Sequence, residues 1–372
     1  MPTQSKRLLS LDVFRGITIA GMILVNTIVL SPFQILDHAE WNGCTFADLV
    51  FPFFLVVMGI SLVLSISKQR SVGISQSHIV YKVIQRTFII FLLGMLLNIF
   101  PYHMTSDTFV TVRVYGVLQR IALCYFFAAL TYLYLNTVLQ IVLTGALLLG
   151  YWMLMTYYPV PHYGFGNLSP AGNLGAYLDR FIFNSANLYG KVFDPEGLLS
   201  TLPAIASTLF GNIVGIGLLT RKTATQKCLG MLAAGTLLMA LGWFWGQWFP
   251  INKALWTSSY ALWTAGMALI SFAVCYGLIE IKHIVRWSKP FEIFGLNAIV
   301  AYFLHVLFFK IQLKIHLGCG WGKTCNLRQI ILKDLFGWMT LPYASLAYAI
   351  TSVLFWLLVL TILYKRKIFI RV

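Results

Sequence analysis

The stretch LDHAEWNGCTFADLVFPFF, residues 36–54, contains the side chain best suited to chemistry in this chain, His38. A neutral imidazole can take up a proton or attack a carbonyl carbon near neutral pH, so His38 is a candidate general base or nucleophile. It lies between Asp37 and Glu40, shortly before a long apolar stretch. A histidine in a surface loop is usually inert, so its chemistry depends on what the surrounding elements bring to it.

Asp48 follows in the same stretch and has two interpretations. Thr45 and Asp48 have the spacing of a capping box before an apolar run, which predicts a helix beginning at residue 46 with Asp48 in its positive first turn. In that interpretation Asp48 is structural, and Trp41 anchors the chain at a membrane interface. In the other, both residues belong to a site around His38, and the sequence leaves the two open.

Several polar side chains lie inside stretches that are otherwise apolar. Such groups are costly in a bilayer and are functional candidates by default. Arg120 follows Gln119 in YGVLQRIALCYF, about 9 Å into its predicted helix at 1.5 Å per residue. Its guanidinium either reaches back to the membrane surface or binds a phosphate or carbonyl oxygen. Asn297 and His305 are about 80° apart around one predicted helix, so both can face one cavity.

The first apolar stretch carries three further polar residues. Asn26 lies near its end, where a single Asn often hydrogen-bonds to a neighbouring membrane helix. Asp12 and Arg15 are three positions apart, so we expect them to pair on one helix face.

The segment FDPEGLLSTLPAIAS carries a second acidic group. It predicts a helix start, with Asp194 as the N-cap, Pro195 at the first helical position and Glu196 in the first turn. That structural role explains Asp194 well. Glu196 then needs no other role than a favourable interaction of its carboxylate with the helix dipole.

The composition indicates what positions these residues. Of the 372 residues, 59% are hydrophobic and only 10% are charged, against about a quarter in soluble domains, so the chain is a membrane protein. The net charge of +16 comes from Lys and Arg in short loops between apolar stretches. Because no basic, aromatic-rich domain is present, nucleic acid is not an expected partner. No Cys or His spacing indicates a metal site.

About ten apolar stretches are long enough to cross the hydrocarbon core, for which a helix needs about 20 residues. The remaining loops are too short for a separate soluble domain, so we expect residues 1–372 to form one transmembrane domain with outward loops near 31–45, 158–202 and 314–341. The predicted fold is an all-α polytopic membrane protein with spans near 9–30, 46–67, 84–101, 114–135, 138–157, 203–220, 229–249, 257–281, 290–313 and 342–364.

Lys and Arg are more frequent in the loops on the side of the two termini, which predicts that both termini are cytoplasmic and that His38 faces outward. Asp12 and Arg15 interrupt the first apolar stretch and no small-residue cleavage site follows it, so we expect an uncleaved span rather than a signal peptide. Cys319 and Cys325 share one outward loop, where they are able to form a disulfide.

Several segments together resemble one protein family. SLDVFRG, Asn26 and HAEWNGCTFADLVFPFFLVVMGIS are similar to the signature of the heparan-α-glucosaminide N-acetyltransferase family of multispan membrane acyltransferases. The resemblance continues in order through RVYGVLQRIALCYF, AYLDRF, FDPEGLLSTLPAI and FGLNAIVAYFLH, so it covers nearly the whole chain. Animal members move acetyl from cytosolic acetyl-CoA to the terminal glucosamine of heparan sulfate. The sequence has no counterpart of their long luminal N-terminal region, so we expect a compact bacterial member whose acceptor is not heparan.

The resemblance implies roles for individual residues. It places the family's active-site histidine on His38, as base or acyl carrier, its membrane asparagine on Asn26, and the arginine of its LQR motif on Arg120. Acetyl-CoA is assigned to Arg120, Gln119, Asn297 and His305, and the outward-facing acceptor to Glu40, Trp41, Asn42, Asp48, Asp179 and Glu196.

The expected function is therefore transfer of acetyl from cytosolic acetyl-CoA, across a bacterial inner membrane, to a glucosamine-type amine on the outer face. The resemblance implies a homodimer, and the Cys and His spacing predicts no metal. Direct attack by the acceptor and an acetylated His38 are both open routes. The alternative function is a transporter of N-acetylglucosamine or a related amino sugar, since polar groups within spans suit a transport path equally well.

Overall fold

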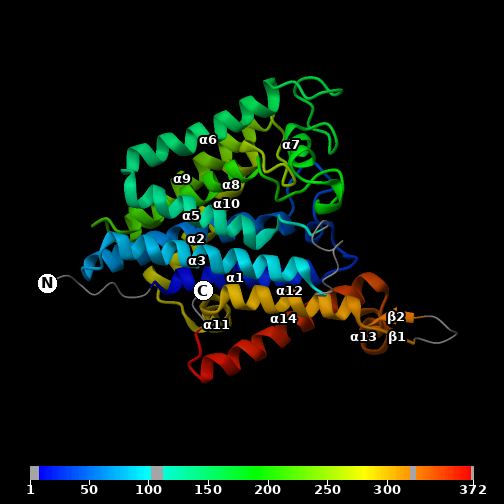
Figure 1. The fold of residues 1–372 in the computed structure, drawn as a ribbon. Helices are drawn as coiled ribbons and strands as arrows, with labels where there is room; N and C mark the ends of the chain where they lie inside the picture. The colour runs from blue at the N-terminus through cyan, green and yellow to red at the C-terminus, as the bar shows by residue number, and fades with distance from the viewer. Residues whose placement is uncertain (1–7, 102–111, 319–323, 370–372) are drawn as a thin grey trace.

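The computed structural model describes residues 8–101, 112–318 and 324–369, and these form an all-α protein with one small hairpin (Figure 1). The long helices run side by side along one common direction, as expected of helices that cross a membrane. The helices and strands are α1 (Leu9–Thr27), η1 (Gln34–Leu36), α2 (Phe46–Ser71), α3 (Gln76–Ile99), α5 (Val117–Tyr134), α6 (Thr137–Tyr157), α7 (Leu174–Ile182), η2 (Ser185–Asn187), α8 (Thr201–Leu218), α9 (Ala224–Trp245), α10 (Ser258–Tyr276), η3 (Gly277–Ile281), η4 (Arg286–Ser288), α11 (Lys289–Leu296), α12 (Ala298–Lys314), β1 (His316–Gly318), β2 (Thr324–Asn326), α13 (Leu327–Phe336) and α14 (Leu341–Lys365).

The prediction of about ten spans is confirmed. Within the described part of the chain, nine helices are long and apolar enough to cross a membrane, and a bent helix pair makes a tenth span if it is counted as one. Asn136 caps α6 by accepting a hydrogen bond from the N–H of Leu139, so α5 and α6 are two separate helices.

The expected continuous span over 290–313 is wrong. The chain is bent by 72° between α11 and α12, and Asn297 is the residue at the break. The backbone of Asn297 has left the helical region, and its side-chain Nδ2 donates to the carbonyl of Ile368, 3.2 Å away. Sharp bends usually need a local cause such as an inserted polar group or a glycine, and here Gly295 and Asn297 adjoin the break.

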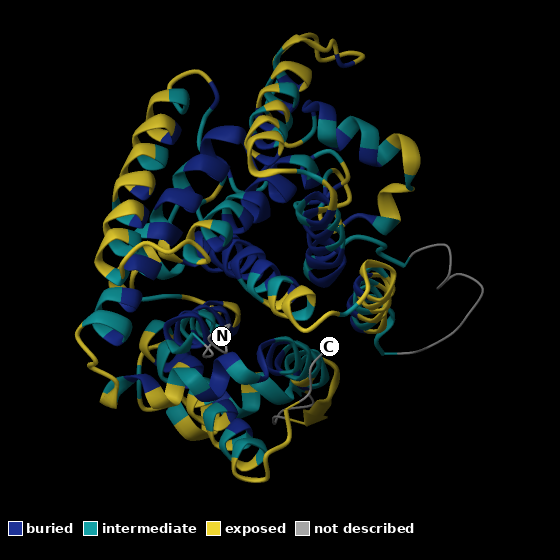
Figure 2. Ribbon diagram, turned by 90° about the vertical axis from the view of Figure 1, so that its left-hand side faces the viewer, coloured by how far each residue is buried: buried dark blue, intermediate teal, exposed yellow. Residues whose placement is uncertain are grey.

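The helices form a buried centre and an exposed periphery (Figure 2). In the most apolar 18-residue stretch of α2, 83% of the residues are buried inside the protein, whereas in α9 the share is 17%. Most of this stretch is also buried in α1, α8 and α10, and most of it is not buried in α3, α6 and α14. Because lipid is as apolar as a protein core, peripheral helices can expose Leu and Phe at no cost, and burial therefore separates central from lipid-facing helices.

The packing of α2 on α8 depends on two glycines that let the backbones approach. A Cβ at Gly211 would lie 2.1 Å from the carbonyl oxygen of Val56, and one at Gly59 would lie 2.2 Å from that of Thr208. Small residues at such contacts are the usual means of close helix packing in membranes. This contact fixes α2, which carries Asp48, against the centre of the bundle.

The segments 28–45 and 158–200 and the β1–β2 hairpin lie at one end of the bundle, on the right in Figure 1. We call this the His38 end. Strands β1 and β2 pair antiparallel, with His316 opposite Asn326, and α13 follows directly. Cys325 in β2 is disulfide-bonded. Cys319 lies outside the described residues, so the Cys319–Cys325 pairing stays a prediction.

Candidate active site

The loop that carries His38 is fastened to a second loop far along the chain. The N–H of Gly43 donates to the carbonyl of Ile251 at 2.7 Å, and the Nδ2 group of Asn252 donates to Oδ1 of Asn42 at 3.1 Å. Gly43 has φ of +113°, a conformation that L side chains rarely adopt, so glycine is needed for this backbone pairing. The pairing brings the segment before α10 next to the segment before α2.

Asp48 is buried at the start of α2 and serves as its capping-box residue, as the sequence predicted. Its Oδ2 accepts the backbone N–H groups of Thr45 at 3.0 Å and Ala39 at 3.1 Å. The hydroxyl of Tyr260, on α10, donates to the Asp48 carbonyl at 2.6 Å. These contacts hold the carboxylate rigidly, with its Oδ1 directed away from the backbone donors and toward His38.

His38 meets Oδ1 of Asp48 through its Nδ1 atom, 2.8 Å away. A carboxylate only accepts hydrogen bonds, so this contact places the proton of a neutral imidazole on Nδ1 and leaves a lone pair on Nε2. The two interpretations of Asp48 are therefore compatible: one oxygen caps the helix and the other orients His38. An imidazole fixed in this tautomer can act as a base or nucleophile through Nε2.

Lys253 is the third charged group of the cluster. Its Nζ lies 3.2 Å from Oδ1 of Asp48 and 3.0 Å from Nδ1 of His38. Since an ammonium only donates and Nδ1 already carries a proton, the ion pair with Asp48 is the favourable contact. The His38 side chain is 48% exposed, whereas the Asp48 carboxylate beneath it is 1% exposed. An accessible imidazole thus contacts a buried carboxylate whose charge is balanced by Lys253.

The neighbouring thiol of Cys44 is not a competing nucleophile. Burial raises the pKa of Cys44 to about 12, and the nearby Asp48 charge adds to the effect. Thiols react as thiolates, so Cys44 is inert near neutral pH.

Arg120 lies close to this end of the bundle, and its position differs from the expected depth. Helix α5 begins at Val117, so Arg120 is in the first turn rather than six residues inside the span. It is 1% exposed, and its Nη2 donates to the carbonyl of Gly197 at 3.2 Å and to the hydroxyl of Ser200. Among the described residues its Nε and Nη1 have no hydrogen-bond partner. A guanidinium with spare buried donors fits an oxygen ligand, because such donors are costly if left unpaired.

Trp256 connects Arg120 with the Lys253 loop. The Arg120 guanidinium lies over the Trp256 ring, 5.1 Å from its centre, and the backbone N–H of Trp256 donates to the carbonyl of Lys253 at 3.0 Å. Arg120 and the His38 cluster are therefore neighbours through one buried indole.

The other residues assigned to acetyl-CoA do not gather at one place. Gln119 points toward α3, where its Nε2 lies 3.7 Å from the sulfur of Met95. Asn297 is at the α11–α12 break, whereas His305 is buried on α12, with its ring centre 6.3 Å from that of Trp356. The expectation that Asn297 and His305 share one environment is thus not met by their contacts.

Asn26 is exposed in the last turn of α1. The next residue, Thr27, accepts a hydrogen bond at 2.7 Å through its carbonyl from Nη2 of Arg328 on α13. A cation at a helix C-terminus is favourable, so this contact fixes the end of α1. The predicted Asp12–Arg15 pair on the same helix is confirmed, with Nη1 of Arg15 3.2 Å from Oδ1 of Asp12.

Glu196, one of the acidic residues assigned to the acceptor, forms a second cluster with Asp194 around Arg113. Its Nε and Nη2 donate to the two carboxylate oxygens of Asp194 at 2.7 and 2.6 Å, and Nη2 also pairs with Glu196. Burial alone would lower the pKa of Arg113, but the hydrogen bonds and charges of Asp194 and Glu196 raise it above the ordinary value. The prediction that Asp194 caps a helix is wrong, because α8 begins only at Thr201.

Asp179 on α7 is buried and accepts a hydrogen bond from the N–H of Leu198 at 3.1 Å. Burial raises the pKa of Asp179 to about 6, although that hydrogen bond opposes the shift. Glu40 is exposed beside His38 in the sequence. Trp41 donates its indole N–H to the carbonyl of Leu168 at 3.1 Å and packs edge-on against Phe193, so it joins the His38 loop to segment 158–200.

Sequence reasoning missed Lys253 and Arg113 as site residues and treated both only as charges that report topology. The signal for Lys253 was present, because it is a basic residue in the short loop between two spans at the outward side. Its contact with His38 joins positions 215 residues apart, and no local pattern indicates such a contact.

The chain is similar in sequence to known proteins. The family described as "Heparan-alpha-glucosaminide N-acetyltransferase, catalytic" matches residues 7–174, which include His38, Asp48 and Arg120. The human heparan-alpha-glucosaminide N-acetyltransferase is 29% identical over 98% of this chain, and the mouse protein is 26% identical over 99%. The chain is a relative of the heparan-alpha-glucosaminide N-acetyltransferases. The resemblance noted in the sequence is thereby confirmed.

The two heparan-alpha-glucosaminide N-acetyltransferases are longer proteins. This chain spans 59% of the human protein and 61% of the mouse protein. The matched family region ends at residue 174, before Lys253 in the chain, so the match contains only part of the His38 cluster.

Proposed function

We propose that this chain is an integral-membrane acetyltransferase that moves acetyl from acetyl-CoA to the amine of an amino sugar at the His38 end. The observation that carries the proposal is the contact of His38 Nδ1 with the buried Asp48 carboxylate, which leaves Nε2 as an accessible base or nucleophile. Both relatives are named as N-acetyltransferases, which supports this choice of reaction.

Two routes fit a histidine held in this way. In direct transfer, the acceptor nitrogen attacks the thioester carbonyl while Nε2 takes the proton that nitrogen loses. The new C–N bond forms, the C–S bond breaks, and CoA leaves as a thiol after taking up a proton. In the covalent route, Nε2 attacks first, CoA leaves, and the acceptor amine then displaces the imidazole from the acetyl group.

In both routes negative charge develops on the carbonyl oxygen of the acetyl group. Stabilising that charge is usually a large part of acyl-transfer catalysis. Lys253 offers a cation beside His38, and the spare Nε and Nη1 donors of Arg120 offer further hydrogen bonds. We assign Arg120 to the acyl end of acetyl-CoA rather than to its phosphates, because it lies in the first turn of α5 at the His38 end. Asn26 is the donor to the same oxygen that the family resemblance implies.

We place both termini in the cytoplasm and the His38 end outside, in a bacterial inner membrane, with residues 1–372 as one catalytic domain. In this arrangement the acetyl group crosses while the CoA nucleotide stays on the cytoplasmic side, where the α11–α12 break with Asn297 lies near the C-terminus. The acceptor would meet Glu40, Asn42 and the acidic side chains of segment 158–200, and two copies would associate in the bilayer.

The test uses purified protein in liposomes. Vesicles are loaded with acetyl-CoA labelled in its acetyl group, and glucosamine is added outside. Labelled N-acetylglucosamine in the outer solution is the expected result. Accumulation of external, unlabelled N-acetylglucosamine without any need for acetyl-CoA would instead support the transporter alternative.

Two variants make this test specific to His38. His38→Asn keeps a group that can donate to Asp48 but cannot act as the base, so acetyl transfer should fall at least about a hundredfold while acetyl-CoA still binds. His162→Asn is the matched control, because His162 is an exposed loop histidine with a left-handed backbone that Asn tolerates. Full activity of His38→Asn would refute the proposed function.

A further inference from the structure

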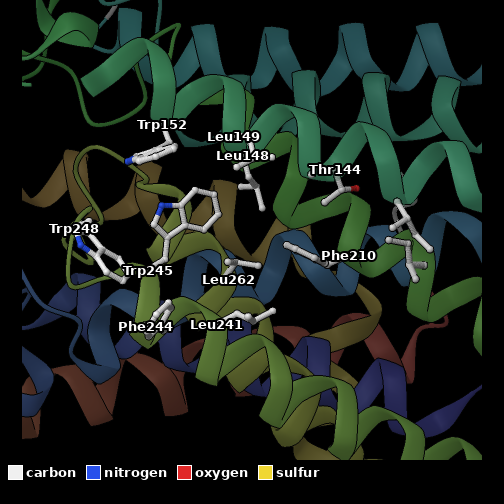
Figure 3. Close-up of a pocket in the computed structure, with 13 residues that line it drawn as sticks. Thr144, Leu148, Leu149, Trp152, Phe210, Leu241, Phe244, Trp245, Trp248 and Leu262 are labelled. Carbon is white, nitrogen blue, oxygen red and sulfur yellow. The ribbon is translucent and has the colours of Figure 1, made fainter. Parts of the chain in front are cut away.

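An apolar groove lies between α6, α8, α9 and α10, away from the His38 cluster. It has a volume of about 700 Å³, within the range of small-molecule binding sites. Figure 3 shows its labelled side chains converging on one space, with three tryptophans at one end and Thr144 toward the other. The lining residues are Ile141, Thr144, Gly145, Leu148, Leu149, Trp152, Phe210, Ile213, Leu241, Phe244, Trp245, Trp248 and Leu262.

The groove is open to the surroundings of the bundle. Leu241 is 46% exposed and Phe244 is 59% exposed, while Leu148 and Leu262 are buried and form the floor. Both α6 and α9 belong to the helices that expose most of their apolar surface. Because these helices cross the membrane, the medium at the mouth of the groove is lipid rather than water.

The length of the groove matches one leaflet of a bilayer. On α6 it extends from Ile141 to Trp152, about 16 Å at 1.5 Å per residue. Half of a hydrocarbon core of about 30 Å is about 15 Å. Trp152, Trp245 and Trp248 lie toward the ends of their helices at the His38 end, where membrane proteins carry the aromatic residues that sit at headgroup level.

The lining of the groove is almost entirely apolar, and among its lining residues Thr144 carries the only hydroxyl. Thin, flexible hydrocarbon chains fit this space, and no charged side chain lines it.

We propose that this groove binds the acyl chains of a membrane phospholipid from the leaflet at the His38 end, with the headgroup at the level of Trp152, Trp245 and Trp248. Trp152 and Trp245 also pack in the hydrophobic cluster that contains Trp41, Phe249 and Leu255. The bound lipid therefore supports the same cluster that carries the loop of His38 and the loop of Lys253. This site is separate from the acetyl-transfer site and does not depend on the proposed reaction.

The test is photo-crosslinking in vesicles of phosphatidylethanolamine and phosphatidylglycerol that contain a phosphatidylethanolamine with a diazirine in its acyl chain. After illumination, crosslinked peptides are mapped by mass spectrometry. We expect peptides from 141–152 and 241–248 to be labelled about tenfold more than those of α3, which is also lipid-facing, and that ratio corresponds to about 1.4 kcal/mol. Equal labelling of α3 and the groove in the wild-type protein would overturn the proposal, and this comparison needs no variant.

Two glycines on α6 provide a matched pair of variants. A Cβ at Gly145 or at Gly150 meets no atom within 4 Å, so Leu can be introduced at either position without a clash. Gly145 lines the groove and Gly150 does not. Gly145→Leu should reduce groove labelling to the level of α3, and Gly150→Leu should leave it unchanged. Undiminished labelling in Gly145→Leu would contradict the proposal.

Discussion

Replacing Asp48 with Asn changes the hydrogen-bond character of the group that orients His38. In the native protein, Oδ2 of Asp48 accepts two backbone N–H groups and Oδ1 accepts from His38. The Asn side chain has one oxygen and one amide nitrogen. The amide oxygen must accept from the backbone N–H groups of Ala39 and Thr45, because in the reverse orientation the amide N–H groups would face these two donors. The amide nitrogen therefore faces Nδ1 of His38.

That orientation forces His38 into the wrong tautomer. An amide N–H donates, so Nδ1 must become the acceptor and the ring proton moves to Nε2, which can then act neither as base nor as nucleophile. General-base catalysis contributes about 10²–10⁴-fold, so acetyl transfer by Asp48→Asn should fall by about that factor. The two backbone hydrogen bonds are kept, so the loss of folding stability should stay within about 1–3 kcal/mol.

The assay is acetyl transfer to glucosamine in liposomes, together with acetyl-CoA binding and thermal unfolding in detergent. Because His38 and Asp48 act as one unit, the His38→Asn and Asp48→Asn changes combined should cost no more than His38→Asn alone. Thr45→Ala is the control: it removes a hydroxyl that contacts the carbonyl of Asp37 and Oδ2 of Asp48, weakens the α2 cap, and keeps the contact of Asp48 Oδ1 with His38. The reasoning would be refuted if the activity losses of the two single variants multiplied in the double variant. It would also be refuted if Asp48→Asn kept more than a tenth of the native activity.

Three further changes test other parts of the structure. Lys253→Met removes the cation beside Asp48 and His38, so transfer should fall at least about tenfold with acetyl-CoA affinity kept, as measured by kcat and KM separately; unchanged kcat would exclude a role for the ammonium. Asp179 holds a proton in the folded protein between its unfolded pKa of 3.8 and its folded pKa of about 6, so stability falls as pH rises through that window. Asp179→Asn should therefore raise the free energy of unfolding at pH 7.5 by at most about 3 kcal/mol, seen as a higher melting temperature, and should not raise it at pH 4. A gain equal at both pH values would contradict this origin. Gly211→Ala places a methyl 2.1 Å from the Val56 carbonyl and should destabilise by about 1–3 kcal/mol in thermal unfolding, while Gly217→Ala on the same helix meets open space and should not.

The spans and the cap of α2 could be predicted because their causes are local. Length and apolarity alone decide whether a helix can cross a bilayer, and the Thr45–Asp48 cap depends on four consecutive residues. Asp194 had an equally good local pattern for a cap, yet its carboxylate pairs with Arg113, 81 positions away, and accepts the N–H of Glu196 in a turn, while the helix begins only at Thr201. Asp48 keeps its cap although Lys253 also contacts it, because the cap uses Oδ2 and the Lys253 contact uses Oδ1.

The family resemblance made His38 the candidate catalytic residue, and that role stays a prediction. What the sequence left undecided for Asp48 was which of two roles it has, and the structure gives one role to each carboxylate oxygen. The bend at Asn297 and the contact of Lys253 with His38 depend on tertiary packing, and neither has a motif. The expected depth of Arg120 was too great because the first residues of that stretch, up to Gly116, are extended rather than helical.

The backbone pairing of Gly43 with Ile251 has a consequence for how the protein is made. A ribosome releases His38 long before Lys253, since 215 positions separate them. Until α9 has been inserted and the following loop has docked, Lys253 does not lie beside His38. The N–H of Gly43 likewise lacks the Ile251 carbonyl as its acceptor. The nascent protein therefore passes through a stage in which the first spans are in the membrane while the site is incomplete. Co-expressed halves of the chain, divided in the loop between α8 and α9, should each lack activity and regain it only when both reach the same bilayer.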